Sequence, residues 1–402
     1  MIGELLGDAS ILEGLAVLRD SSASATRDAR EEIVARVAWS VVAEPGDGVA
    51  GALVAAMGAA SAWRTVIDGG TGIGLLAPDN GARELRDGIA RWRPRVSVAR
   101  VGSALRDAAQ LGARLLLPGD EEWPEPLDDL DAHAPLVLWT RGDVSALRAD
   151  ERVGIVGARA ATAYGEHVAG EIAGDLAAAG ASVISGGAYG IDGAAHRAAL
   201  GVGGATVAFL AGGVDRAYPQ GHRDLFRRIV GTGAVVSEIP CGTPPTKWRF
   251  LSRNRLIAAL SDATVVVEAG WRSGSLNTAG HAAALGRPLG AVPGPVTSPA
   301  SAGCHRLLRE YDARCVTTAE EVRELWRPST DAASKASRES PERTRLLDAI
   351  SARTAWDADE LARRSGIAPT SVRSLLGMLE LEGLVQRTER GWRRRGADER
   401  RG

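Results

Sequence analysis

The stretch Ile184-Ser-Gly-Gly-Ala-Tyr-Gly-Ile-Asp-Gly-Ala-Ala-His196 decides the fold of this chain. An apolar run at 181–184 predicts a buried strand that ends at a Ser-Gly-Gly corner. The residues after that corner predict a helix carrying Asp192 and His196. Glycines at such a corner allow a sharp turn and let another molecule approach the backbone amides closely. The stretch therefore predicts a strand–turn–helix unit with a ligand-facing corner.

The same pattern occurs at Val153-Gly-Ile-Val-Gly157 and again around Ser273-Gly-Ser275. Between and around these corners, the apolar pattern predicts seven strands, at 152–156, 181–185, 205–209, 234–237, 263–267, 288–292 and 313–316. The intervening segments predict helices at 163–179, 190–200, 222–230, 253–260, 276–285 and 303–310. This alternation with short glycine-rich joints predicts an α/β fold with a doubly wound parallel sheet. The three corners are expected at one edge of that sheet.

The segments that precede this core have a different pattern. Residues 1–110 are rich in alanine and predict a helical domain, with helices within 30–42, 50–63 and 82–92. Residues 111–150 predict short strands separated by proline turns, which extend the sheet or wrap its edge. We therefore expect an α/β domain at 111–327 with its core at 151–317.

The segments that follow the core predict a second, smaller module. Residues 328–341 are polar and predict a linker. Residues 342–395 predict three helices, at 343–350, 359–365 and 370–382, followed by a two-stranded wing. This order is typical of a winged helix-turn-helix domain.

Composition favours a globular protein that meets a polyanion in its middle segment. Of the 402 residues, 24% are charged and 45% are hydrophobic, as in ordinary globular domains. The formal net charge of -2 is unevenly spread, because residues 1–150 carry an acidic excess and residues 151–317 a basic excess. The middle segment is therefore the expected partner of a polyanion.

The N-terminus and the cysteines favour a cytoplasmic location. Glu4 and Asp8 lie where a signal peptide would carry basic residues, and the longest apolar run, 49–63, is too short to span a bilayer. The three cysteines form no CxxC pair, which argues against a disulfide framework. We expect a cytoplasmic protein that does not meet the membrane.

Several common chemistries have no signature in this sequence. A phosphate-binding GxxxxGK[ST] loop is absent because no glycine precedes a lysine. HExxH and paired CxxC metal signatures are absent as well. Ser185, Asp192 and His196 resemble the components of a triad. However, two side chains four residues apart on one helix more often support the neighbouring loop by hydrogen bonding. The sequence therefore predicts no catalytic residue, no metal and no cofactor.

Anion binding has better support from the residues. Ser273-Gly-Ser275 precedes a helical run, where exposed N–H groups accept phosphate, and Arg159 lies just past the first strand of the core. Arg253 and Arg255 flank Asn254, and guanidinium groups suit phosphate diesters. Three aromatic residues offer stacking faces for bases: Tyr189, Tyr218 and Trp248. Singly, each arginine is more often salt-bridged or solvated. Together they predict either a nucleic-acid or nucleotide groove or a structural arginine cluster.

Six blocks in this order resemble the DNA-processing protein A family (DprA/Smf). They are Val153-Gly-Ile-Val-Gly-Ala-Arg159 with Tyr164-Gly165, then Ser185 to His196, Gly212-Gly-Val-Asp215 with Tyr218-Pro219, Ser237-Glu-Ile-Pro240 with Arg253-Asn-Arg-Leu-Ile-Ala258, Val267-Glu268 with Ser273-Gly-Ser275, and Val292-Pro-Gly294 with Gly303-Cys-His. The blocks lie between residues 153 and 305. The chain has Ala158 where serine is usual and Leu251 where proline is common, and Asn277 and His281 are unusual in the helix after Ser275.

The resemblance implies an extended Rossmann-like domain that dimerises and binds single-stranded DNA. It also implies a protein that protects incoming strands and loads the RecA recombinase on them during natural transformation. In that family pattern Arg159 holds a backbone phosphate, and Lys247, Arg253 and Arg255 are further groove residues. The complete set of expected DNA-binding residues is Gly157, Arg159, Ser185, Gly186, Gly187, Lys247, Arg253, Asn254, Arg255, Ser273, Gly274 and Ser275.

Two other functions remain as alternatives. Related Rossmann-like proteins include nucleotide-monophosphate hydrolases with a catalytic Arg/Glu pair, a part that Arg272 and Glu268 could take. The PGGxGT loop of those hydrolases is missing here. The second alternative is a winged-helix transcription regulator, with Arg373 on the expected recognition helix as its base-reading residue.

Overall fold

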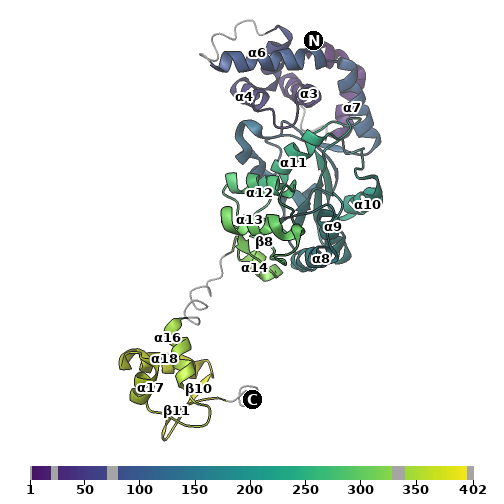
Figure 1. Ribbon diagram of the computed structural model, residues 1–402. Coiled ribbons are helices and arrows are strands. Elements are labelled where there is room, and N and C mark those ends of the chain that lie inside the picture. Colours follow the sequence, from purple (N-terminus) through teal and green to yellow (C-terminus); the bar gives the residue numbers. More distant parts are fainter. Residues whose placement is uncertain (1, 20–25, 70–79, 328–339, 396–402) are drawn as a thin grey trace. The chain divides into compact units, whose positions relative to one another are not determined.

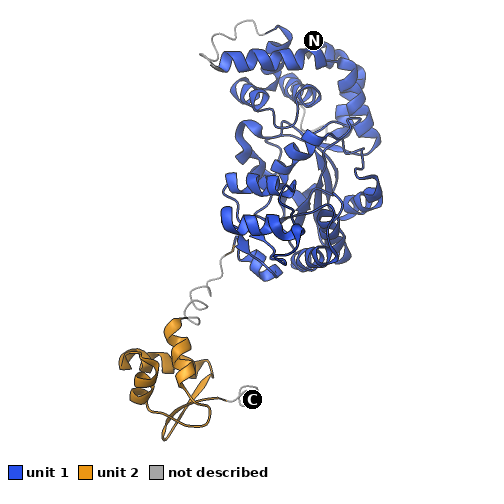
Figure 2. Cartoon of the chain, in the orientation of Figure 1, with its two compact units in different colours: residues 1–326 blue, residues 327–402 orange. Residues whose placement is uncertain are grey.

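The computed structural model describes residues 2–19, 26–69, 80–327 and 340–395. The chain forms two compact units, residues 1–326 and residues 327–402 (Figure 2). Most of the linker expected at 328–341 lies outside the described residues.

Nine strands of the first unit form one sheet, in the order β1-β2-β6-β5-β4-β3-β7-β8-β9. Their bounds are β1 (Arg114–Leu116), β2 (Leu138–Gly142), β3 (Arg152–Val156), β4 (Ser182–Ser185), β5 (Thr206–Phe209), β6 (Ala234–Ser237), β7 (Ala263–Val266), β8 (Leu289–Ala291) and β9 (Arg314–Cys315). The seven strands from β3 to β9 run parallel, so the predicted doubly wound sheet is confirmed. The two short strands before the core add to one edge of the sheet, where β2 pairs antiparallel with both β6 and β1.

Helices cover both faces of this sheet, which explains why its central strands are buried along almost their whole length. Side chains alternate between the faces. Val156, Ile184 and Val266 pack on one face in a core shared with α11 (Lys247–Leu260), α12 (Ser275–Ala284) and α13 (Ala302–Glu310). Val153 and Val183 pack on the other face in a core shared with α8 (Ala163–Ala178), α9 (Ile191–Gly201) and α14 (Ala319–Arg323) (Figure 1). The helix α10 (Arg223–Thr232) follows β5 and packs against β6.

The N-terminal helices share their core with the antiparallel edge of the sheet. They are α1 (Ile2–Gly7), α2 (Ala9–Leu18), α3 (Arg27–Val42), α4 (Gly48–Met57), α5 (Ala59–Ile67), α6 (Asn80–Trp92) and α7 (Val98–Gln110). Trp39 lies at the centre of this core, with its ring edge-on to Trp63 at 5.9 Å and to Trp92 at 5.0 Å between centroids. Leu115 and Trp139 of the sheet belong to the same core. The expected boundary at residue 110 is therefore where the helices give way to strands, and it lies within one compact unit.

The apolar helices α4 and α5 bear on the expectation about membranes. Among the described residues, no single helix is long and apolar enough to cross a membrane. The pair α4 and α5, which is bent by 116° at its break, passes that test by length and composition alone.

Helix α11 begins six residues earlier than the sequence pattern predicted. The expected start was residue 253, but the helix covers Lys247–Leu260 because Thr246 caps it and accepts a hydrogen bond from the N–H of Arg249 at 3.4 Å. The preceding prolines, Pro244 and Pro245, end the extended segment before this cap. The two additional turns place Phe250 on the same helix as Arg253.

The second unit has the predicted winged-helix order. It contains α16 (Pro341–Ala349), α17 (Ala358–Ser365), α18 (Pro369–Leu381) and the hairpin β10 (Val385–Thr388) with β11 (Gly391–Arg394). Gly366 ends α17 with a left-handed backbone, φ +67°, which favours glycine. The buried side chains Leu346, Leu361, Leu376 and Val385 form the core of this unit.

Candidate nucleic-acid interface

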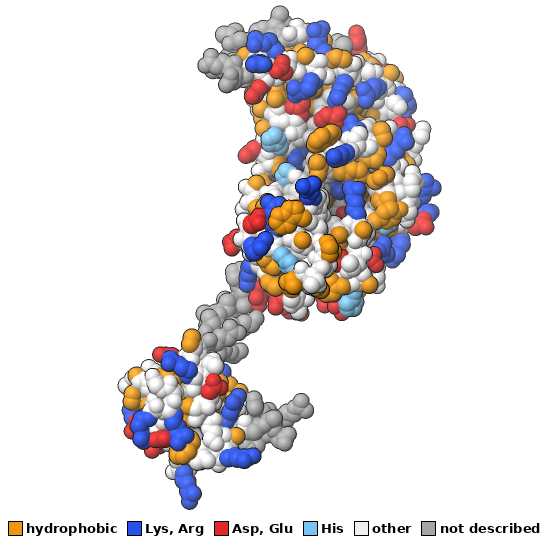
Figure 3. Space-filling model, viewed as in Figure 1, with side chains coloured by type: hydrophobic (Ala, Val, Ile, Leu, Met, Phe, Trp, Pro, Cys, Tyr) orange, Lys and Arg blue, Asp and Glu red, His pale blue; other side chains and the backbone are white. Residues whose placement is uncertain are grey.

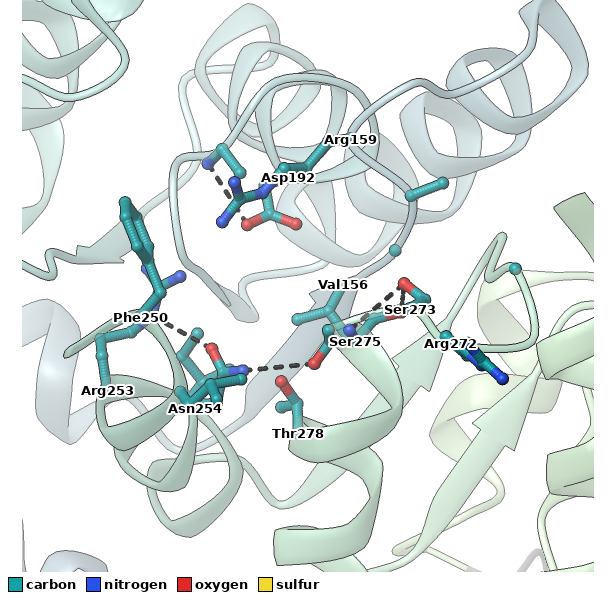
Figure 4. A pocket seen from close by; sticks show the side chains of 17 residues that line it. Val156, Arg159, Asp192, Phe250, Arg253, Asn254, Arg272, Ser273, Ser275 and Thr278 are labelled. Carbon is teal, nitrogen blue, oxygen red and sulfur yellow. Dashed lines mark hydrogen bonds between the residues drawn. The ribbon is translucent and has the colours of Figure 1, made fainter. Parts of the chain in front are cut away.

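A cleft of about 460 Å³ opens at the carboxyl ends of β3, β4 and β7 (Figure 4). The first strand of the core, β3, has β4 on one side and β7 on the other, so the chain reverses its direction of sheet growth at this point. In doubly wound sheets, ligands bind at this switch point. Residues of α11 and of the segment at the start of α12 form two of its walls. Of the three glycine corners in the sequence, two line the cleft directly and the third adjoins it.

The loop after β3 contributes Arg159, an exposed side chain that lines the cleft. Its guanidinium carbon lies 4.8 Å from the ring centroid of Phe250, a cation–π distance. No ion pair joins Arg159 to any described residue. Gly157 packs closely behind this loop, because a Cβ at that position would lie 2.5 Å from Cγ1 of Ile191. The loop therefore presents a cation, without an ion pair to the described residues, above an aromatic ring.

The loop after β4 is held by buried hydrogen bonds. The Ser185 hydroxyl donates to the carbonyl oxygen of Ile155 at 2.6 Å and does not face the cleft. Asp192 accepts from the backbone N–H of Gly186 at 3.2 Å and of Ala188 at 3.3 Å. Burial raises the pKa of Asp192, opposed by the positive charges of Arg253 and Arg159 and by these two hydrogen bonds. Gly187 turns the chain with φ +69°. Ser185, Gly186 and Gly187 therefore shape the cleft from behind.

The expected support from both Asp192 and His196 needs a correction. Asp192 does support the loop, but the Nδ1 atom of His196 lies 2.7 Å from the hydroxyl of Thr206, on β5. That hydroxyl donates its own proton to the carbonyl of Val183 at 2.7 Å, so the imidazole is the donor to it. His196 therefore ties α9 to the sheet instead of supporting the loop.

Arg253 lines the cleft but is only 6% exposed. One of its terminal nitrogens donates to the carbonyl oxygens of Gly186, at 2.7 Å, and of Phe209. Burial lowers the pKa of Arg253 to about 10, the Arg159 charge acts in the same direction, and Asp192 opposes both. The side chain remains protonated at neutral pH. It therefore fixes the loop and contributes positive potential to the cleft floor.

Asn254 and Arg255 differ in where they point. Asn254 lines the cleft and donates through its amide to the carbonyl of Gly274 at 3.3 Å and to the side-chain oxygen of Asn277 at 3.2 Å. Arg255 lies outside the cleft, contrary to the expectation. It is two positions after Arg253 on α11, and this spacing places the two side chains on different faces of the helix. It is 5% exposed and donates to both carboxylate oxygens of Glu238, at 2.7 and 2.8 Å. Arg255 is therefore a structural ion-pair residue.

The start of α12 forms another wall of the cleft. Gly274 is the N-cap of this helix and offers no side-chain acceptor to the first N–H groups. The Ser273 and Ser275 hydroxyls lie 2.8 Å apart at the same point, and all three residues line the cleft. Arg272 beside them is exposed and also lines the cleft (Figure 4). The first N–H groups of α12 are already used, contrary to the expectation, because that of Ser275 donates to the Ser273 hydroxyl at 3.3 Å and that of Leu276 to the Ser273 carbonyl at 3.2 Å. The groups suited to a phosphate here are therefore the serine hydroxyls and the Arg272 guanidinium.

Lys247 lies outside the cleft lining, in the first turn of α11. Its side chain is exposed, and its ammonium lies 5.9 Å from the ring centroid of Trp248. It precedes Phe250 by three residues, so the two lie near one another along the helix.

Sequence reasoning missed Phe250, which lines the cleft and whose ring contacts two guanidinium groups. A signal was present, because Lys247, Phe250 and Arg253 recur at intervals of three residues. It was hidden by the late start predicted for the helix. The ring of Tyr218, 47% exposed, lies 5.4 Å from that of Phe250 and extends the aromatic surface. Figure 3 shows basic and apolar side chains interspersed on the visible face of the first unit.

Glu268 of the hydrolase alternative and Arg373 of the regulator alternative have other partners in the structure. Glu268 is 4% exposed, and its two oxygens accept from the N–H and the hydroxyl of Thr162 at 2.9 and 2.7 Å. It does not line the cleft, whereas a hydrolytic carboxylate needs to face the substrate. Arg373 on α18 donates to Asp359 at 3.1 Å. Neither arrangement favours the hydrolase or the base-reading regulator.

Comparisons with known proteins agree with this geometry. The family model described as DNA recombination-mediator protein A matches residues 114–327, and that of the DprA winged helix domain matches residues 329–389. A DprA-type protein of Mycobacterium tuberculosis is 43% identical over 386 residues, which cover 89% of this chain and 93% of the relative. The DNA processing protein DprA of Bacillus subtilis is 37% identical over 188 residues, covering 47% and 63%.

A solved structure is similar as well. The X-ray structure of DNA processing protein A from Streptococcus pneumoniae superposes with a TM-score of 0.59 at 28% identity, covering 73% of this chain and 96% of the other. The family model for residues 114–327 spans more than half of the chain, and the mycobacterial relative is matched over nearly its whole length. The chain therefore belongs to the DNA recombination-mediator protein A family, also called DprA/Smf.

Proposed function

We propose that this protein binds single-stranded DNA in the cleft at the ends of β3, β4 and β7. The observation that carries the proposal is the Arg159 guanidinium, unpaired among the described residues, which lies 4.8 Å above the Phe250 ring at the switch point of the sheet. The cation would hold a backbone phosphate and the aromatic surface would stack a base. Every base has a flat face, so such a surface binds strands with little sequence preference.

The proposal favours single strands over a duplex for a geometric reason. The rings of Phe250 and Tyr218 offer stacking faces, and a base paired inside a duplex cannot lie on them. The proposed DNA contacts are Arg159, Phe250, Arg272 and the start of α12 at Ser273–Ser275. Lys247, about one turn before Phe250 at the start of α11, is a further proposed contact.

The wider role is proposed from family membership. A mediator that binds incoming single strands would protect them and load the RecA recombinase during natural transformation. It would act in the cytoplasm, as a homodimer formed through the Rossmann-like domain. No catalytic step is part of this proposal, because the chemistry required is strand binding and release.

The test is a titration of fluorescent single strands, the matching duplex and free nucleotides at several salt concentrations. Single strands should bind more tightly than the duplex, and log K should fall with log salt by about 0.7 per phosphate neutralised. Equal affinity for the duplex, or binding without salt dependence, would count against the cleft. Release of base or phosphate from nucleoside monophosphates, abolished in Glu268→Ala, would favour the hydrolase instead.

A further inference from the structure

A second cavity, of about 500 Å³, lies on the other side of α11. It is lined by Trp248, Leu251, Ser252 and Arg255 of α11, by Asn277, His281, Ala284 and Leu285 at and after α12, and by Pro45, Gly46, Asp129, Leu130 and His133. Leu251 lines both this cavity and the cleft, so the two adjoin across one turn of helix. A chain that leaves the cleft over α11 would enter this cavity next.

Trp248 gives this cavity an unusually open aromatic wall. Its side chain is 72% exposed, more than that of any other aromatic among the exposed large apolar side chains of the described residues. Keeping an indole ring in water forfeits the favourable free energy that its burial would release. The Lys247 ammonium lies 5.9 Å from the same ring. A flat ring with a neighbouring cation matches the two parts of a nucleotide, a base and a phosphate.

Two polar side chains that line the cavity, Asn277 and His281, have hydrogen-bonding groups without partners among the described residues. The side-chain oxygen of Asn277 accepts from Asn254, while its amide nitrogen donates to none of the described residues. His281 is half-buried, and its imidazole has no hydrogen-bond partner in the described parts of the chain. Burial lowers the pKa of His281, and the positive charges of Arg255 and His133 act in the same direction. The imidazole is therefore neutral at pH 7.

The two charged side chains that line this cavity, Arg255 and Asp129, both form ion pairs. Arg255 is held by both carboxylate oxygens of Glu238, and Asp129 is paired with Arg287 at 2.5 Å. The Nδ1 atom of His133 lies 2.8 Å from the carbonyl oxygen of Gly46 and is the donor to it. Among the described residues that line this cavity, both charged side chains are ion-paired, which leaves the Asn277 amide and the His281 imidazole for a ligand. Such groups suit the edge of a nucleobase better than a phosphate.

We propose that this cavity is a second subsite, which takes a nucleobase of the same single strand that occupies the cleft. The base would stack on Trp248 with its edge toward Asn277 and His281, and its phosphate would lie at Lys247. The inference rests on the proposed function and adds to it a path for the strand, from the cleft across α11 into the second cavity.

Oligo(dT) strands of increasing length test the path. In the wild type, affinity should rise in a step, on the order of tenfold, when the strand becomes long enough to reach Trp248. Trp248→Ala should lose this step and bind short strands as the wild type does, whereas Trp248→Phe should recover part of it. Trp271→Ala is the matched control, because Trp271 is 53% exposed and lines neither cavity. It should keep the step.

A single abasic site moved along a long strand identifies the contact itself. One abasic position should weaken wild-type binding by on the order of tenfold and weaken Trp248→Ala no further, because the ring and base act as a pair. If the abasic response persists unchanged in Trp248→Ala while Arg159→Ala still loses affinity, the second subsite is wrong and the cleft stands. If the wild type binds no strand of any length, both proposals are wrong.

Discussion

We expect strand binding in the cleft to depend most on Arg159. Arg159→Ala should weaken single-strand binding by about 1–3 kcal/mol, the range for charge-assisted hydrogen bonds. The salt slope should become shallower by about 0.7 if one phosphate contact is lost. Arg159→Lys should recover only part of the affinity, because a point charge cannot reproduce the guanidinium fork. Fluorescence anisotropy over a salt series measures both quantities.

The control for this variant is Arg228→Ala on α10. Arg228 is also exposed, has no ion pair with the described residues and lines none of the described cavities. It should leave both the affinity and the salt slope close to wild type. Arg159 is solvent-facing, so its removal should barely change the thermal midpoint. A variant that melts early while its folded fraction binds normally would show that Arg159 is structural and that the groove lies elsewhere.

His196 should make the stability of the fold depend on mildly acidic pH. Burial lowers the pKa of His196 to about 3, well below the ordinary value of 6.5, and its Nε2 has no hydrogen-bond partner among the described residues. The unfolded chain binds a proton below pH 6.5 but the folded chain does not. This contribution to stability is therefore complete above pH 6.5 and is lost as the pH falls toward 3.

Urea unfolding at pH 7 and pH 5 measures this effect. Between these two values the wild type should lose about 2 kcal/mol through this group. His196→Phe removes the titrating ring but keeps a flat side chain, so its loss over the same interval should be smaller by that amount. Equal losses in the two proteins would mean that the imidazole is accessible to protons in the folded state.

At the scale of elements, the turn between β4 and α9 positions the loop that carries Arg159. Gly190 has φ +73°, and a Cβ there would lie 2.3 Å from the carbonyl oxygen of Ala158. Gly190→Ala should therefore cost about 1–3 kcal/mol of stability and also weaken strand binding, because the Arg159 loop is displaced. Gly180→Ala is the control: its φ is +95° but no atom lies within 4 Å. It should lose stability and keep the affinity. Melting curves and strand titrations of both variants measure these two effects.

The same scale shows what could be read from the sequence. The seven parallel strands and the winged helix follow from apolar runs and turn residues, because burial on both faces leaves a continuous apolar stretch. The first turns of α11 could not be predicted this way, since its residues 247–252 have no apolar periodicity and the cap at Thr246 decides the start. The partners of Arg255 and Glu268 could not be predicted either. Glu238 and Thr162 lie on other elements, and only the fold brings them into contact.

At the scale of the whole molecule, the proposed binding residues all belong to the first unit. The cleft and the second cavity are formed by residues within 45–285. The first unit therefore contains every contact that the proposals require, together with its own hydrophobic cores. The exposed face of α18 in the second unit includes Leu381, which is 90% exposed, and the ion-paired Arg373. Such a face is a poor reader of base edges.

Deletion of residues 330–402 should consequently leave a folded protein that binds single strands with nearly the affinity of the full chain. The winged helix has a separate core around Leu346 and Leu376, so its removal exposes no core of the first unit. Circular dichroism melting and the same anisotropy titration test this expectation, with Arg159→Ala in the truncated chain as the control that binding still uses the cleft. Strand binding that survives only in the isolated winged helix would move the function to the C-terminal unit, because phosphate contacts would then come from its own arginines, such as Arg387 and Arg390 on the wing.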